Sequence, residues 1–183
     1  NAKMQTMPGF GIFYMPINTT VEPFTDVAVR RAVALSIDRR EIVDNLYAGK
    51  GKAATTFLLA SLPEAKVDPK LELVHDPKTA ASLLDGAGWK PGPDGIRVKD
   101  GKPLVVTLWT QSDTEFKRMT EVIQAQLKSV GIRAEISVFD TSAIRAEYKK
   151  GKQQLAVRSY GWNNADILDW FFSGERIGYP NIS

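Results

Sequence analysis

The sequence predicts an α/β fold in which a mixed sheet carries flanking helices. Short runs rich in β-branched and aromatic residues alternate along the chain with segments whose apolar residues repeat every three or four positions. The clearest helical pattern, over 112–130, lies between two such runs, as in the strand–helix–strand unit of a parallel pair. Of the 183 residues, 43% are hydrophobic and 25% are charged, which is typical of a globular domain.

The N-terminal third is expected to hold one strand and two capped helices. Residues 11–18 form an apolar run suited to a strand. Asp26 is placed to cap the first helix and to pair with Arg30 one turn later. Asp38 and Glu41 have the spacing of a capping box for the second helix. The apolar residues that repeat along the first helix are Val29, Val33 and Ile37.

The middle of the chain is expected to hold an irregular stretch, a third helix and a hairpin. Residues 50–74 show no clear periodicity. Asp76 and Pro77 supply an N-cap and a proline at the first helical position. Asp100 and Gly101 stand between two strand-like runs, which is a hairpin signal.

The last third continues the α/β pattern without a linker, an internal repeat or a low-complexity block. Ser112 and Glu115 predict a capping box for the long helix, which should end at Gly131. The elements expected after it are a strand over 132–139, a helix over 142–149, a strand over 155–159 and a helix over 166–172. Residues 1–183 are therefore expected to form a single domain.

Composition excludes several kinds of function. The chain has no cysteine, which removes disulfides, thiolate metal sites and cysteine nucleophiles. Its one histidine, His75, rules out a site built on several histidines. No phosphate-binding, dinucleotide-binding or calcium-binding loop motif is present either, so no metal, cofactor or catalytic residue is predicted. The 24 basic and 21 acidic residues are interleaved and leave a net charge of +3, so no nucleic-acid partner is expected.

A series of motifs, spread in order along nearly the whole chain, resembles one known family. The motifs lie at 18, 23–26, 29–32, 36–39, 76–89, 92–97, 100–104, 123–132, 161–173 and 181–183. Together they resemble the family 5 extracellular solute-binding proteins, the oligopeptide- and dipeptide-binding components of ABC importers. The motif over 23–42 is interpreted as structural, because its acids are placed to cap helices.

The resemblance implies that residues 1–183 are one lobe, domain III, of a longer protein with the two-lobed type II periplasmic-binding-protein fold. Asn1 and Ala2 are interpreted as a possible tag remnant. Such a protein captures a short peptide or similar small solute between its lobes and delivers it to an ABC permease. Its implied location is the periplasm, or the cell surface as a membrane-anchored lipoprotein whose signal is not in this stretch.

The resemblance places the candidate ligand contacts near the C-terminal end, at Trp162, Asn163, Asn164 and Asp166. In peptide-binding relatives an aspartate shortly after this tryptophan, commonly three residues on, takes the ammonium group of the peptide. Here the third position is Ala165 and Asp166 is the fourth. Asp166 is therefore either a ligand carboxylate or a helix cap, and the two asparagines are candidates for uncharged contacts.

Two alternatives remain open from the sequence. The cargo of a family 5 protein can also be a nickel chelate, an opine, glutathione or an oligosaccharide. A small hydrolase with Asp166 and His75 as its acid and base is the alternative from another class of function.

Overall fold

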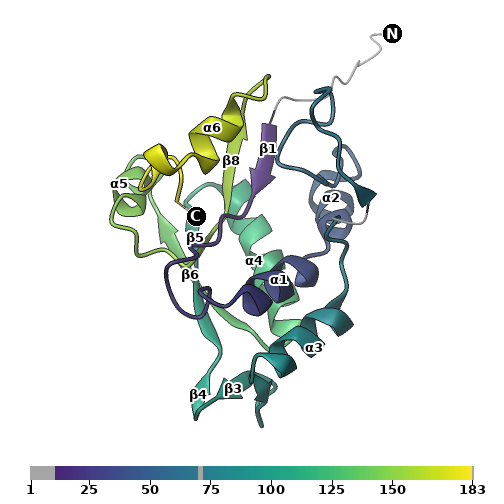
Figure 1. Ribbon diagram of the computed structural model, residues 1–183, viewed down its shortest axis with the longest axis vertical. Helices are drawn as coiled ribbons and strands as arrows, with labels where there is room; N and C mark the ends of the chain where they lie inside the picture. Colours follow the sequence, from purple (N-terminus) through teal and green to yellow (C-terminus); the bar gives the residue numbers. More distant parts are fainter. Residues whose placement is uncertain (1–10, 70–71, 183) are drawn as a thin grey trace.

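The computed structural model describes residues 11–69 and 72–182 (Figure 1). Its regular elements, in chain order, are β1 (Gly11–Tyr14), α1 (Val27–Ser36), α2 (Arg39–Tyr47), α3 (Pro77–Gly86), β2 (Lys90–Pro91), β3 (Arg97–Lys99), β4 (Lys102–Pro103), β5 (Val105–Gln111), α4 (Thr114–Ser129), β6 (Arg133–Phe139), α5 (Ile144–Tyr148), β7 (Leu155–Ala156), β8 (Arg158–Gly161), α6 (Ile167–Phe172) and the short 3-10 helix η2 (Gly174–Arg176). The predicted α/β class is confirmed. Asn1 and Ala2 lie outside the described residues, so their interpretation stays a prediction.

The centre of the fold is a parallel three-stranded sheet in the order β6-β5-β7. Helix α4 connects β5 to β6 and packs on both strands, which confirms the predicted strand–helix–strand unit. An antiparallel bridge between Ile17 and Leu155 adds a second direction of pairing, so the sheet is mixed, as predicted.

The expected strand over 155–159 is in fact two strands that belong to different sheets. β7 pairs with β5, and the backbone N–H of Val157 then donates to the carbonyl of Trp109 at 2.9 Å. Beyond this residue the chain leaves the parallel sheet, and β8 pairs antiparallel with β1, with Arg158 opposite Tyr14. Figure 1 shows β1 and β8 side by side, with α6 next to β8.

Helices α1 and α2 begin where the capping residues predict. The Asp26 carboxylate accepts a hydrogen bond from the backbone N–H two residues further along the chain. The Asp38 carboxylate accepts hydrogen bonds from the backbone N–H groups two and three residues further along. The predicted pair between Arg30 and Asp26 is wrong. Arg30 Nη1 instead donates to the carbonyls of Phe24 and Thr25, which precede the helix.

Helix α4 has the predicted buried face but a different start. Its N-cap is Asp113 rather than Ser112. The Asp113 side chain makes no capping bond, and its Oδ2 accepts a hydrogen bond from Thr141 Oγ1 at 3.0 Å. The helix is followed by Gly131 at φ +88°, where an added Cβ would lie 2.7 Å from Cγ of Arg97. The buried residues of the predicted stripe are Phe116, Met119, Ile123, Leu127 and Val130.

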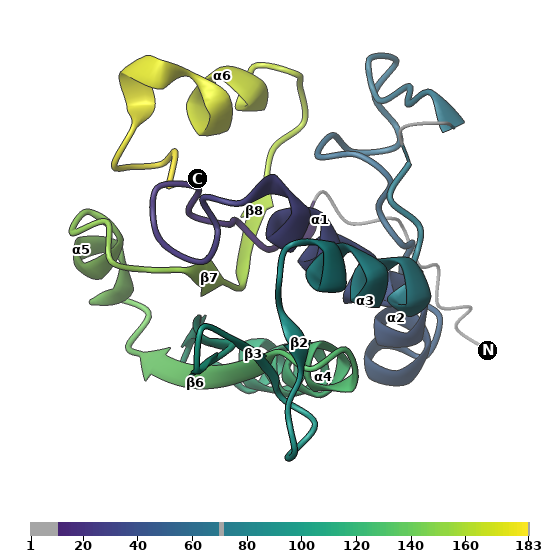
Figure 2. The same cartoon turned by 60° about the horizontal axis from the view of Figure 1, so that its bottom comes forward.

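The main core fills the space between the parallel sheet and helices α1, α3 and α4 (Figure 2). Its fully buried members include Phe24, Val29, Val33, Leu84, Leu104, Leu108, Leu127, Ile132 and Leu155. A smaller cluster lies toward α5 and the C-terminal end, and consists of Trp109, Ile144, Tyr148, Ala156 and Ile182. The second cluster includes Ala156 of β7, which precedes β8 in the chain.

The three short strands β2, β3 and β4 form an antiparallel sheet whose predicted turn at 100–101 has positive φ at both residues. The buried side chain of Arg97 fixes this sheet to the rest of the molecule. Its Nε donates to the carbonyl of Val130 at 2.8 Å, and its Nη1 donates to Asp85 Oδ1 and to the carbonyl of Trp89, both at 2.7 Å.

Two of the N-cap aspartates, Asp26 and Asp113, give a matched test of the capping argument. Asp26→Ala is expected to lower the free energy of unfolding by about 0.5–2 kcal/mol, because it removes the acceptor for a helical N–H. Asp113→Ala removes no capping bond and should cost less. Urea unfolding of both variants measures the difference, and equal losses would contradict the assignment.

Candidate functional site

The predicted ligand residues lie on an exposed face formed by the end of β8, helix α6 and η2. Figures 1 and 2 show α6 next to β8, at the outside of the molecule. Ile167 is buried and anchors the helix, while the rings of Trp162 and Trp170 lie 6.0 Å apart. We call the exposed apolar side chains of this region the aromatic face: Trp162, Leu168, Trp170, Phe172 and Ile177.

The two asparagines have different surroundings. Oδ1 of Asn164 accepts a hydrogen bond from Trp162 Nε1 at 2.8 Å and another from the backbone N–H of Asp166 at 3.0 Å. Asn164 therefore fixes the loop and orients the indole ring, a role that the sequence did not suggest. Asn163 is exposed beside it.

Asp166 occupies the N-cap position of α6, but its side chain makes no capping hydrogen bond. It is exposed, and no residue of the described ranges forms a hydrogen bond or an ion pair with its carboxylate. Of the two roles left open by the sequence, the side-chain cap is therefore wrong. The carboxylate is exposed and has no partner from the described chain.

Trp170 and Arg176 also lie in this region, and no sequence motif indicated a role for either of them. The Arg176 guanidinium lies 4.4 Å from the ring centroid of Trp170 and 3.2 Å from Asp169 Oδ2. This arrangement braces the outer indole and satisfies Asp169. The signal in the sequence is the run Trp170, Phe171 and Phe172, because three adjacent aromatic residues on a short helix cannot all face the core.

Beneath α6, aromatic rings surround the buried side chain of Arg158, which is 8% exposed. Its guanidinium carbon lies 4.9 Å from the ring centroid of Tyr148. The centroids of Tyr179, Phe171 and Tyr14 follow at 5.3, 5.7 and 5.8 Å. Burial raises the pKa of Tyr148 to about 12 and raises the pKa of Tyr14 as well, while the charge of Arg158 opposes both shifts.

Two cavities border strand β1. The larger, of about 520 Å³, lies between β1, α2 and residues 51–57, and its lining includes none of the predicted ligand residues. The smaller, of about 200 Å³, lies beside Arg158. Tyr14 and Phe57 line both cavities, and the Tyr160 hydroxyl holds Phe57 by donating to its carbonyl.

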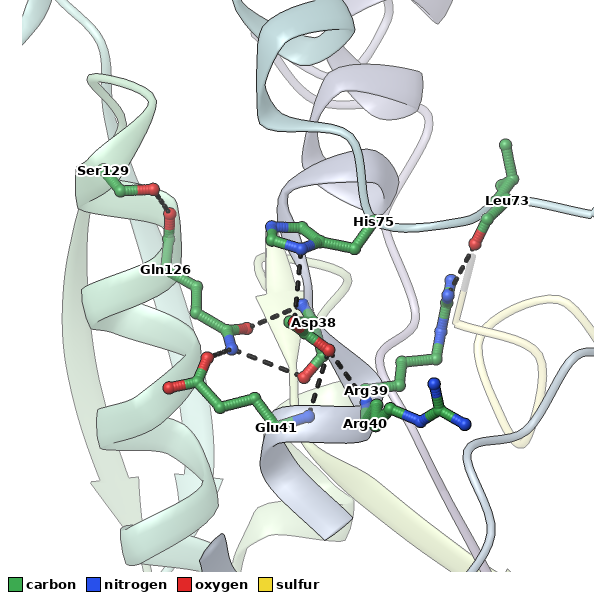
Figure 3. Close-up of polar contacts among 8 residues, drawn as sticks. All are labelled: Asp38, Arg39, Arg40, Glu41, Leu73, His75, Gln126 and Ser129. Atoms are coloured by element: carbon green, nitrogen blue, oxygen red, sulfur yellow. Dashed lines mark hydrogen bonds and ion pairs between the residues drawn. The ribbon is translucent and has the colours of Figure 1, made fainter. Parts of the chain in front are cut away.

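His75 belongs to another part of the molecule. Its Nδ1 lies 3.3 Å from Asp38 Oδ2, and Arg39 Nη1 donates to the carbonyl of Leu73 at 2.6 Å, so these contacts tie the segment before α3 to the start of α2 (Figure 3). Figure 1 shows the start of α2 well separated from α6, which Asp166 precedes. The acid–base pair that a hydrolase would need is therefore not brought together.

Within residues 11–69 and 72–182, no three or more acidic or histidine side chains are grouped to hold a metal ion. None of the helices in the same ranges has the length and apolar character needed to cross a membrane.

The fold and the face together describe an α/β protein that exposes aromatic and polar side chains on one side. The sequence matches the family described as "Bacterial extracellular solute-binding proteins, family 5 Middle" over residues 1–178. The chain belongs to this family, whose members are solute-binding proteins of transport systems rather than enzymes.

Relatives with established names bind different solutes. The Nickel-binding periplasmic protein of Escherichia coli (strain K12) is 31% identical over 140 residues, which cover 75% of this chain and 26% of that protein. The Oligopeptide-binding protein AppA of Bacillus subtilis (strain 168) is 30% identical over 176 residues, which cover 93% and 32% respectively.

Solved structures agree on the fold. AppA from Bacillus subtilis in complex with a nonapeptide matches with a TM-score of 0.80 and 28% identity over 93% of this chain and 35% of that chain. NikA from Brucella suis in complex with Fe(III)-EDTA matches with a TM-score of 0.77 and 31% identity over 85% and 31%. This chain spans only about a quarter to a third of the length of the relatives that it matches.

Proposed function

We propose that this chain is domain III, one lobe of a longer solute-binding protein that holds a short peptide or similar small solute between two lobes and delivers it to an ABC permease. The share of the relatives' length that the chain spans supports the lobe assignment. Several relatives are named for peptide binding, which supports the cargo class. The partners are then the cargo, the remaining lobes of the same protein and the permease, and the location is the periplasm or the cell surface, with a lipoprotein anchor.

The observation that carries this proposal is the exposed carboxylate of Asp166, whose backbone N–H shares the acceptor Asn164 Oδ1 with the indole N–H of Trp162. Exposed apolar side chains that gather on a protein surface mark binding sites, and the rings of Trp162 and Trp170 lie 6.0 Å apart here. An ammonium group next to an indole ring gains a cation–π contact, and a carboxylate without a partner supplies the opposite charge. Asp166 and Trp162 therefore suit the N-terminal ammonium of a peptide, once a second lobe excludes water from both.

The asparagines fit the same role as uncharged contacts. Oδ1 of Asn164 is already occupied by the loop, which leaves its amide N–H groups to donate to a carbonyl of the cargo. Asn163 is exposed next to it and presents both a donor and an acceptor.

A non-peptide cargo is the second candidate. The paired indole rings of Trp162 and Trp170 present broad apolar surfaces that also suit the apolar faces of sugar rings. A relative from Thermotoga maritima was solved with mannohexaose bound, at a TM-score of 0.80 and 26% identity over 96% of this chain and 34% of that chain. A sugar lacks an ammonium group, so the contribution of Asp166 separates the two kinds of cargo.

Replacing Asp166 by asparagine in the full-length protein tests whether Asp166 binds the N-terminal ammonium group of a peptide. The variant should lose about 1.5–3 kcal/mol of affinity for peptides with a free N-terminus, the usual contribution of a hydrogen bond to a charged group. N-acetylated peptides should bind wild type and variant equally. Asp169→Asn is the matched control, because Asp169 already pairs with Arg176. Calorimetric titration of the wild type and both variants with each kind of peptide measures these affinities, and unchanged affinity in Asp166→Asn would show that Asp166 does not contact the ligand.

A further inference from the structure

The buried Arg158 side chain lacks an acidic partner in the described part of the chain. None of the ion pairs formed by residues 11–69 and 72–182 includes it. A guanidinium group carries five N–H donors. Within the same ranges its side chain makes one hydrogen bond, from Nη1 to the carbonyl of Pro180 at 3.3 Å. Most of the donors of a group that is 8% exposed are thus left without an acceptor there.

Two phenol groups near Arg158 are in a similar position. The hydroxyls of Tyr14 and Tyr148 are buried and make no hydrogen bond with the described residues. Burial raises the pKa of both phenols, so both stay protonated at neutral pH and present O–H donors. The two phenol hydroxyls therefore lack an acceptor among the described residues, and Arg158 has one acceptor for its five N–H donors.

A cavity of about 200 Å³ adjoins these donors. Arg158 and Tyr14 line it together with Phe57, Phe171 and Ile182. Its size is sufficient for a small organic group, because a cavity of roughly 150 Å³ binds benzene. The cavity has a cation and a phenol on its wall, and its lining contains no acidic side chain among the described residues.

We infer that Arg158 binds a carboxylate group that the described chain does not supply and that enters this cavity. A carboxylate offers two oxygens to the fork of a guanidinium and accepts further hydrogen bonds from phenols, so it matches the surplus of donors. The carboxylate comes either from the cargo, in which case the inference rests on the proposed function, or from an acidic residue of the remaining lobes.

The competing explanation is that the rings alone satisfy Arg158 through cation–π contacts. Arg145 supplies an internal comparison, because its guanidinium lies 4.4 Å from the ring centroid of Tyr179 but is exposed and does not line the cavity. Rings stabilise both arginines, whereas only Arg158 faces the cavity. A carboxylate site should therefore depend on Arg158 and be indifferent to Arg145.

Benzoate and benzamide are suitable probes, because they share a ring and differ in the charge of the group presented to Arg158. Each is titrated into the 183-residue chain at constant ionic strength, and binding is followed by the NMR signals of the arginine Nε–H groups. We expect at least a tenfold preference for benzoate, with a saturable shift of the Arg158 signal. Arg145→Gln should keep this preference, and Arg158→Gln should abolish it.

Tyr14→Phe keeps the test valid if Arg158→Gln fails to fold, because it removes one hydroxyl and preserves the ring. It should reduce the preference for benzoate by about twofold to fivefold. Equal binding of benzoate and benzamide to the wild-type chain would overturn the inference. So would a preference that both Tyr14→Phe and Arg158→Gln leave unchanged.

The same titration of the full-length protein without added solute separates the two sources. A retained preference for benzoate shows that the site is open to the carboxylate of a cargo. If an acid of the remaining lobes fills it, the preference disappears and Arg158→Gln lowers the melting temperature of the full-length protein more than that of the 183-residue chain. Neither probe needs to be transported. The result therefore tests this inference even if no peptide binds the full-length protein, an outcome that would contradict the proposed function alone.

Discussion

Replacing Arg97 by methionine is expected to lower the free energy of unfolding by about 3–5 kcal/mol. Methionine keeps much of the apolar stem, so the change isolates the hydrogen bonds of the guanidinium. Without them the carbonyls of Val130 and Trp89 lose their donor, and an unpaired buried acceptor costs far more than a typical hydrogen bond contributes. Because these bonds join β3 to the ends of α3 and α4, urea unfolding should show the loss as one cooperative transition at a lower midpoint.

Arg133→Met is the matched control for this prediction. Arg133 and Arg97 both reach a carboxylate at 2.7 Å, but their side chains are 47% and 7% exposed. An exposed ion pair contributes only about 0–1 kcal/mol, so Arg133→Met should change stability little. Similar losses in the two variants would show that burial does not decide the contribution of Arg97.

The same contact has a dependence on pH. The hydrogen bond from Arg97 lowers the pKa of Asp85 below its ordinary value. A carboxyl whose folded-state pKa is lowered contributes stability above its unfolded pKa and loses it as the pH falls through the folded value. The difference in stability between wild type and Arg97→Met should therefore shrink in acid, and a difference that grows in acid would contradict the role of Asp85.

The helices were predictable because their signals are local. Asp26 and Asp38 cap the helices that follow them, and the spacing of apolar residues identified the buried face of α4. The predicted N-cap at Ser112 is wrong by one residue. Asp113 takes the N-cap position, and its carboxylate is engaged by Thr141, which lies 28 residues away in the chain.

The strands were less predictable, because pairing depends on distant partners. A run over 155–159 looks like one strand, yet it changes sheets at Val157. The sequence contains no proline or glycine there to mark the change. The split arises because β5 offers an edge to β7 while β1 offers one to β8.

The candidate site was predicted only in outline. One exposed face does carry all four predicted residues, Trp162, Asn163, Asn164 and Asp166. Their individual roles as ligand contacts stay predictions. Arg158 was missed, because a charged residue in a strand pattern gives no sign of burial by rings from four other segments.

The isolated 183-residue chain is expected to bind peptides far more weakly than the full-length protein. A micromolar ligand corresponds to about 8 kcal/mol of binding free energy, gained when a cargo is removed from water on all sides. With one lobe, about half of the contacts remain, and the polar groups stay in water where each hydrogen bond contributes little. Half of that free energy corresponds to a dissociation constant of about 1 mM.

Parallel calorimetric titration of the full-length protein and the 183-residue chain with the same peptides of two to five residues tests the two-lobe account most directly. A cooperative melt of the chain, recorded first, ensures that weak binding reflects the missing lobe rather than unfolding. The account predicts micromolar binding by the full-length protein and dissociation constants near or above ~1 mM for the chain. A peptide that binds the chain more tightly than ~50 µM would contradict it, because a single lobe would then carry a complete site.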